Sequence, residues 1–302
     1  MTQLNSKSDL KSNTATLGVV YAITTALFFG LSTPLAKHFL SEVQPWMLAG
    51  LMYLGGGLGL VPIYFLRNRI QRPTTFLKVE DWRILFGSMV AGGLAAPILL
   101  MTGLEHTSAS VASLLLNFES VFTALVAWTI FREPWHWRVL LGIVVITTGG
   151  ILVSHGGQSS IDLSWGGLAI LGTCLAWAID SNFTAKIAHR DPLQVAIFKS
   201  GGAGLVNTAI ATLIGQPWPS ISVTLQIFGA GFVGYGLTYC AFVMALRNIG
   251  ASRTGAFFAL SPVVGVAIAI VFLGDPLSAT LVVAAVLMAL GATLCAWEPS
   301  KG

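Results

Sequence analysis

The segment "LNFESVFTALVAWTIFREP" (116–134) is an apolar run that carries one acidic residue, Glu119, and ends on a Glu-Pro pair. An apolar run of about twenty residues is long enough to cross a bilayer as a helix. A second segment, "FALSPVVGVAIAIVFLGDP" (258–276), aligns with the first without gaps and ends on a matching Asp-Pro pair. The two segments predict membrane-spanning helices that recur in two copies of one unit.

The rest of the chain extends this pattern in both directions. Of its 302 residues, 55% are hydrophobic and only 9% are charged, and the mean hydropathy is +0.79. A soluble domain of this size needs far more charged residues to cover its surface. We therefore predict an all-α membrane protein with ten transmembrane helices. The ten apolar runs are residues 17–40, 46–66, 82–104, 108–131, 137–153, 166–188, 193–214, 225–246, 254–273 and 280–297.

The basic residues indicate how these helices are oriented. If the N-terminus lies inside, Lys37 is the only basic residue on the outer side, and Lys199 lies within a span. The other basic residues all fall on the inner side, as short loops of membrane proteins require. They are Lys7, Lys11, Arg67, Arg69, Arg72, Lys78, Arg83, Arg132, Arg138, Lys186, Arg190, Arg247, Arg253 and Lys301. We expect a multi-pass protein with both termini in the cytoplasm.

An internal repeat divides the chain after a short N-terminal tail, residues 1–16. The first repeat covers residues 17–153 and the second covers 166–297, with five helices each. Further matches support the division, such as Ser32 with Ser181, Ala36 with Ala185 and Pro45 with Pro192. Because five is odd, we expect the second repeat to insert upside down relative to the first. Inverted repeats are typical of secondary transporters, whose binding sites lie near the midplane between the repeats.

The repeated motifs also resemble a known family. The stretches "TSASVASLL" (107–115), "VFTALVAWTIFREP" (121–134) and "GASRTGAFFALSPVVGVAIAIVFLGDP" (250–276) are similar to the EamA-type repeat of the drug/metabolite transporter superfamily. The resemblance covers nearly the whole chain. It implies a ten-helix exporter or permease in the plasma membrane, usually a bacterial inner membrane. The family motif usually has Pro where the first copy has Ser120, whereas the second copy keeps Pro262.

Three ionisable residues within spans are candidates for a substrate-binding or ion-binding site, because charges in a bilayer are costly and usually face a partner or a cavity. Asp180 and Lys199 fall at similar depth on consecutive helices, so we expect them to be neighbours. They are either part of the site or a buried pair that fixes packing. Glu119 lies near the centre of its span, and we expect it to face a cavity between the repeats. It would exchange protons there or contact a cationic part of the solute.

Several uncharged residues join this hypothetical site. Asn117 lies beside Glu119 and could share its hydrogen bonds, and Pro262 occupies nearly the same level in the second repeat. Trp177, Tyr235 and Tyr239 could line an apolar pocket, although aromatic residues at mid-span most often fill the core. The glycine clusters around Gly57 and Gly202 indicate close contacts between helices.

The sequence therefore favours a secondary transporter that moves a small metabolite, amino acid or drug-like solute, with protons as the candidate coupling ion. An intramembrane enzyme is the first alternative, but no HExxH or GxSxG motif is present. A non-transporting assembly subunit is the second. The three cysteines lie in three different spans, which argues against a disulfide framework or a metal cluster. We expect no cofactor and no nucleic-acid partner, and a monomer or a homodimer in the bilayer.

Overall fold

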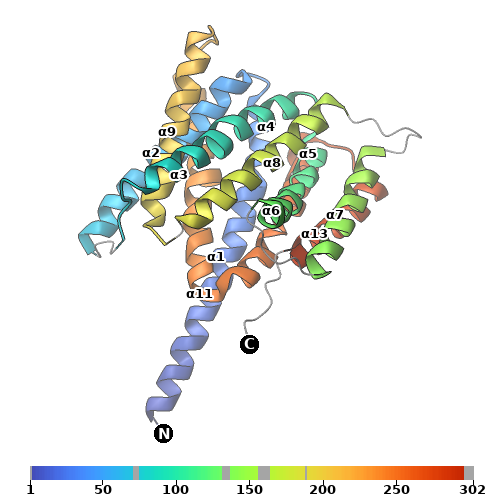
Figure 1. Ribbon diagram of the computed structural model, residues 1–302. Coiled ribbons are helices and arrows are strands. Elements are labelled where there is room, and N and C mark those ends of the chain that lie inside the picture. Colours follow the sequence, from blue (N-terminus) through green and yellow to red (C-terminus); the bar gives the residue numbers. More distant parts are fainter. Residues whose placement is uncertain (1, 71–74, 131–136, 156–163, 188, 296–302) are drawn as a thin grey trace.

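The chain folds into a bundle of helices. The structure, a computed structural model, describes residues 2–70, 75–130, 137–155, 164–187 and 189–295, and all regular elements within these ranges are helical (Figure 1). The helices of the first half are α1 (Thr2–Phe39), α2 (Pro45–Ile70), α3 (Asp81–Ser88), η1 (Met89–Ala95), α4 (Ala96–Glu105), α5 (Ala109–Leu115), α6 (Phe118–Thr129) and α7 (Trp137–His155). Those of the second half are α8 (Trp165–Lys186), α9 (Pro192–Leu213), α10 (Ile221–Gly231), η2 (Phe232–Leu237), α11 (Thr238–Phe258), α12 (Ser261–Ile268), η3 (Ala269–Leu273) and α13 (Ala279–Cys295).

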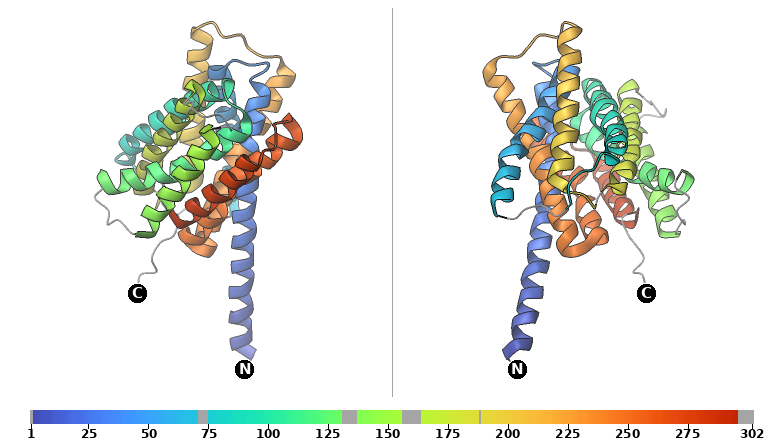
Figure 2. Two further views of the ribbon diagram at one scale, coloured as in Figure 1. Left: turned by 90° about the vertical axis from the view of Figure 1, so that its right-hand side faces the viewer. Right: turned by 60° about the vertical axis from the view of Figure 1, so that its left-hand side comes forward.

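These helices are long and apolar enough for a multi-pass membrane protein. Six segments of the described chain meet the length and hydropathy of a membrane-spanning helix, and three shorter apolar helices accompany them. Each apolar run predicted from the sequence falls on one helix or on consecutive helical segments. The N-terminal part of α1 projects beyond the rest of the bundle (Figure 2).

Two boundaries differ from the sequence prediction. The connection expected at residues 247–253 is wrong, because α11 continues through it to Phe258. Proline is absent from 238–260, so nothing in this stretch removes a helical hydrogen bond before Pro262, which lies in the first turn of α12. The run 108–131 is interrupted at Leu116 and Asn117, which separate α5 from α6. The Glu133-Pro134 pair lies outside the described residues, as does most of the connection expected between residues 154 and 165.

Two π-helical turns, η1 and η2, occupy matching places in the two halves. They end at Ala95 and Leu237, which are 142 residues apart like the segments that reveal the repeat. In each turn a backbone N–H bonds five residues back: Ala96 donates to Ala91, and Thr238 donates to Val233. In a regular α-helix these two N–H groups would instead bond four residues back, to the carbonyl oxygens of Gly92 and Gly234. The Gly92 and Gly234 carbonyls therefore lose their usual helical donors. Such turns are frequent at functional sites.

Glycine lets the helices around the site approach one another closely. A Cβ atom on Gly57 of α2 would lie 2.4 Å from the amide nitrogen of Gly201 in α9. A Cβ atom on Gly231, at the end of α10, would lie 1.9 Å from the carbonyl oxygen of Met52 in α2. Small residues let backbones touch in a bilayer, where apolar side chains gain little by leaving lipid. The glycine clusters thus hold α2 against both α9 and α10, as the sequence predicted.

The largest apolar core lies on one side of this assembly. It joins α1, α2, α4 and α8, and its enclosed members are mostly residues of the first half. Leu48, Met52 and Met101 have no exposed surface, and Leu100 has almost none. A second core includes residues of α7, α12 and α13, with α7 packed directly against α13. The part of the bundle built from α8, α9 and α11 is packed differently, because it surrounds a cavity.

Candidate functional site

A cavity of about 640 Å³ opens among α8, α9, η2 and α11. Each of these helices presents one face to it, since its lining residues recur at spacings of three and four. From α8 these are Trp177, Asp180, Ser181, Thr184 and Ala185; from α9 they are Pro192, Val195, Ala196, Lys199 and Ser200. Gly234, Tyr235, Thr238, Tyr239, Phe242 and Val243 follow from η2 and α11. The first half of the chain contributes only Phe29, Tyr53 and Glu119 among the lining residues described.

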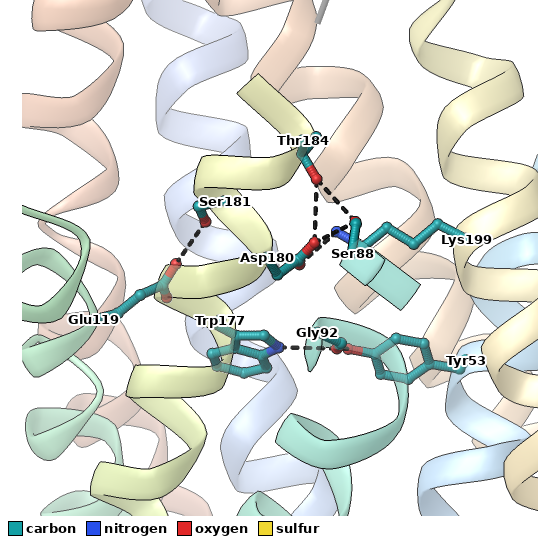
Figure 3. A network of polar contacts seen from close by, with 9 residues as sticks. All are labelled: Tyr53, Ser88, Gly92, Glu119, Trp177, Asp180, Ser181, Thr184 and Lys199. Carbon is teal, nitrogen blue, oxygen red and sulfur yellow. Dashed lines mark hydrogen bonds and ion pairs between the residues drawn. The ribbon is translucent and has the colours of Figure 1, made fainter. Parts of the chain in front are cut away.

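An ion pair crosses one side of the cavity. Lys199 of α9 reaches Asp180 of α8, as the matched depths of the two residues predicted (Figure 3). The same carboxylate accepts a hydrogen bond from Ser88 of α3 and another from Thr184 at 3.1 Å. The hydroxyls of Ser88 and Thr184 lie 3.0 Å apart. Three donors thus surround Asp180, which satisfies a carboxylate that is almost fully buried.

Glu119 approaches α8 from the other side. It lies in the first turn of α6, and its carboxylate is 3.5 Å from the hydroxyl of Ser181 (Figure 3). That distance is at the limit of a hydrogen bond, so the contact is weak. The positive end of a helix favours a carboxylate in its first turn. Glu119 therefore faces the cavity with a carboxylate that has one weak hydrogen bond. On the opposite side of α8, Asp180 and Lys199 neutralise each other.

The π-helical turn η1 leaves the carbonyl oxygen of Gly92 free to accept hydrogen bonds from side chains that line the cavity. The hydroxyl of Tyr53 donates to it at 2.8 Å and the indole N–H of Trp177 at 3.2 Å (Figure 3). The next carbonyl, of Gly93, accepts from the amide of Asn207 at 2.8 Å. Pro97 has no N–H to offer this carbonyl, which leaves it free for a side chain. Tyr53 and Trp177, which are both buried, are thereby fixed in place by one backbone carbonyl, of Gly92, that an α-helix would have used itself.

Aromatic side chains form most of the apolar lining. The ring of Phe29 lies 6.0 Å from that of Trp177 and 5.0 Å from that of Phe258. Phe242 extends the series, 5.6 Å from Phe258, and Tyr235 lies 4.8 Å from Tyr53. These separations are typical of packed aromatic pairs. A solute in the cavity would meet ring faces and edges on several sides.

Most residues singled out from the sequence meet here, and two do not. Glu119, Trp177, Asp180, Lys199, Tyr235 and Tyr239 all line the cavity. The expected bond between Asn117 and the carboxylate of Glu119 is wrong, because the amide of Asn117 donates to the carbonyl oxygen of Leu114. Asn117 lies in the break between α5 and α6, and its side chain turns back onto α5. Pro262 is buried at the start of α12 and is not part of the lining.

Sequence reasoning missed several lining residues. Tyr53, Phe29, Phe242 and Phe258 lie in apolar runs where an aromatic residue carries no signal of its own. Ser181 could have been found, because its match with Ser32 is part of the repeat and it adjoins Asp180. The helical spacing between Trp177, Asp180, Ser181 and Thr184 was also visible.

The two ends of the bundle differ around the cavity. The lining reaches Arg190, in the connection between α8 and α9, and Pro192, the first residue of α9. There Arg190 pairs with Asp81 at 2.7 Å, and Arg67 of α2 pairs with Asp191. At the opposite end Lys37 donates to the carbonyl oxygen of Leu104. The side-chain oxygen of Gln216 also accepts from the backbone N–H of Met47 there, at 2.9 Å. The first contact joins α1 to α4 within the first half, and the second joins α2 to the connection between α9 and α10.

Comparison with known proteins identifies the family of this chain. The model of the EamA-like transporter family matches residues 16–155 and, a second time, residues 164–297. An uncharacterized transporter of Methanothermobacter thermautotrophicus is 28% identical over 93% of this chain and 86% of its own length. A probable amino-acid metabolite efflux pump of Salmonella typhimurium is 25% identical over 89% of this chain and 91% of its own.

A solved crystal structure has the same fold. It superimposes with a TM-score of 0.67 over 93% of this chain and 95% of its own, at 17% sequence identity. This likeness extends over both halves of the chain.

Proposed function

The chain belongs to the EamA-like transporter family and is a membrane transporter, and from this premise we propose that it is a secondary transporter that exports a small solute by alternating access. In such proteins two inverted repeats take turns in enclosing and opening one binding site. The solute would bind in the cavity between Trp177 and Lys199. A metabolite, an amino acid or a drug-like compound fits a cavity of this size.

The observation that carries the proposal is a difference between equivalent faces of the two repeats. The repeat matches Pro45 with Pro192, so Leu48, Ala49 and Met52 of α2 correspond to Val195, Ala196 and Lys199 of α9. In α9 these residues line the cavity, although Val195 and Ala196 are themselves buried in smaller apolar clusters and Lys199 differs most from its partner. In α2 all three have no exposed surface and belong to the main apolar core.

The other cavity helices show the same contrast. Ser181 and Ala185 of α8 line the cavity, whereas their partners in α1, Ser32 and Ala36, are buried. Thr238 and Phe242 of α11 correspond, 142 residues earlier, to Ala96 and Leu100, which lie in the main core. Residues of the second repeat thus line a cavity at positions where the equivalent residues of the first repeat are packed in the core. Exchanging the two arrangements would close this cavity and open its counterpart at the other end of the bundle.

The charge distribution supports an orientation for this state. The end that the cavity reaches carries Arg67, Lys78, Arg83 and Arg190, whereas Lys37 stands alone among the basic residues proposed for the other end. Because cytoplasmic loops are rich in Lys and Arg, the cavity would face the cytoplasm of a cell with this protein in its plasma membrane. A cytoplasmic solute would enter here and leave through the counterpart cavity. Ten helices with both termini in the cytoplasm are part of this proposal.

Protons are the candidate coupling ion, with Glu119 as their carrier. The charged groups that act on it are Asp180 of α8 and Lys199 of α9, and Ser181 is its hydroxyl neighbour. Cys174 lies about two turns before Asp180 and Ser181 along α8 and is buried. Glu119→Gln preserves the shape of the side chain and removes its titration, so it should change the pH dependence of transport.

The proposal is tested by metabolite excretion. Cells that lack the protein and cells that overproduce it should differ in at least one excreted small solute. Ser200→Phe, which places a ring in the cavity, should behave like the deletion. Leu213→Phe is the matched control, because Leu213 is 85% exposed at the end of α9. Identical solute profiles in deletion and overproducing cells, with the protein present in the membrane, would favour a non-transporting subunit.

A further inference from the structure

The charges that line the cavity leave one carboxylate without a cation. Lys199 is paired with Asp180, and Arg190 is paired with Asp81. Glu119 has only the distant hydroxyl of Ser181 among the contacts described. An ionised carboxylate in an apolar cavity is costly unless a cation accompanies it. The cavity therefore attracts positive charge at one point, beside Ser181 on α8.

The lining also contains a second candidate acceptor, which belongs to η2. The π-helical turn η2 leaves the carbonyl oxygen of Gly234 without its usual helical donor, since Thr238 donates to Val233 and Tyr235. Gly234 lines the cavity. Its equivalent in the first half, Gly92, has its carbonyl oxygen filled by the N–H and O–H donors of Trp177 and Tyr53. By analogy, the Gly234 carbonyl is suited to receive a donor from the solute.

The walls favour the same kind of solute. Phe29, Trp177, Phe242 and Phe258 form a continuous series of rings along the cavity. Aromatic faces attract cations as well as apolar groups. A ligand anion would find no uncommitted cation in the described lining, and it would be repelled by Glu119. The acceptors and the rings together require a donor-rich positive group on an apolar body.

We propose that the solute is a protonated primary or secondary amine on an apolar, aromatic body, with its ammonium group bound to Glu119. This inference rests on the proposed function, because it names the solute of that site. The ammonium would donate to the carboxylate of Glu119 and to the carbonyl oxygen of Gly234. Its body would pack against Phe29, Trp177 and Phe258.

The test compares three compounds that share one aromatic body and differ in charge. They are 2-phenylethylamine, which is a cation, phenylalanine, which is a zwitterion, and 3-phenylpropionate, which is an anion. The binding of radiolabelled 2-phenylethylamine to the purified full-length protein is measured by scintillation proximity, with the other two compounds as competitors. We expect the amine to bind most tightly and the anion most weakly, with a difference of roughly tenfold or more between them.

Glu119→Gln should remove this order and leave the three compounds within about threefold of one another. Glu105→Gln is the matched control, because Glu105 is exposed at the end of α4 and outside the cavity. Retained preference for the amine in Glu119→Gln would overturn the inference. So would equal affinities, tighter binding of the zwitterion or anion, or no binding of the amine to the unaltered protein.

The comparison in the unaltered protein stands even if Glu119→Gln does not fold. The excretion experiment separates the two proposals. An excreted acid or zwitterion, with tight binding of the corresponding compound, would leave the transporter proposal in place and refute the amine.

Discussion

The ion pair between Asp180 and Lys199 offers a quantitative test of how this site is built. We predict that removing either charge alone destabilises the protein more than removing both. Asp180→Asn keeps an oxygen that accepts from Ser88 and Thr184, but it leaves Lys199 without its counter-ion. Lys199→Met leaves the Asp180 carboxylate with two hydroxyl donors only. The double variant leaves no charge on this side of α8.

The magnitude follows from the burial of the two groups. Breaking a buried ion pair costs about 3–5 kcal/mol when the remaining charge stays unpaired. The side chains of Asp180 and Lys199 are 8% and 16% exposed, and both line the cavity. Water in the cavity would hydrate the remaining charge in part, so we expect a loss of about 2 kcal/mol for each single variant. The double variant should lose about 1 kcal/mol, which gives a coupling free energy of about 3 kcal/mol.

The free energy of unfolding can be measured by titrating the purified variants from mild detergent into sodium dodecyl sulfate. Arg83→Gln is the control for removing a cation at an exposed site, and we expect it to change stability by less than about 0.5 kcal/mol. Additive losses, with the double variant the least stable of the three, would refute the reasoning. They would mean that the two charges are stabilised independently of each other.

Three further predictions follow from the same contacts. Gly92→Ala should destabilise the protein by about 1–3 kcal/mol, because the new Cβ atom would lie 2.0 Å from the Asp180 carboxylate. Gly229→Ala should not destabilise it, because no atom lies within 4 Å of the new Cβ. Thermal unfolding in detergent distinguishes the two variants. Tyr53→Phe should cost about 1 kcal/mol by removing the bond to the Gly92 carbonyl, and an unchanged unfolding midpoint would contradict this. Reporter fusions at the N-terminus and at residue 78 should both report a cytoplasmic location. A location on opposite sides of the membrane would contradict the ten-helix topology.

The fold was largely predictable because its signals repeat along the chain. The apolar runs give the helices, and the match between residues 116–134 and 258–276 gives the two tandem units. The family model matches the chain twice, as this repeat predicts. The boundary at 247–253 was not predictable from composition. Its polar residues resemble a loop, yet the helix continues through them to Phe258.

The site was predictable in its charged residues and much less so in the others. Asp180, Lys199 and Glu119 stand out because a charge within a span needs a partner or a cavity. Tyr53 and Phe29 do not stand out, since an aromatic residue in an apolar run usually packs in the core. The π-helical turns are also invisible in the sequence, although they release the Gly92 carbonyl that positions Trp177. Asn117 was misplaced because the break between α5 and α6 turns its side chain toward Leu114.

The central claim, that equivalent faces of the two repeats open in turn, is tested most directly by labelling matched cysteines. In a variant with Cys174, Cys240 and Cys295 replaced by alanine, cysteine is introduced singly at Ser32, Ala36, Ser181 or Ala185 and treated with a membrane-impermeant thiol reagent. We predict that Ser181→Cys and Ala185→Cys react from the cytoplasmic side, and that Ser32→Cys and Ala36→Cys react from the outside. Reaction of both members of a pair from the same side would contradict the account. So would complete protection of the Ser32 and Ala36 positions in a protein that still transports.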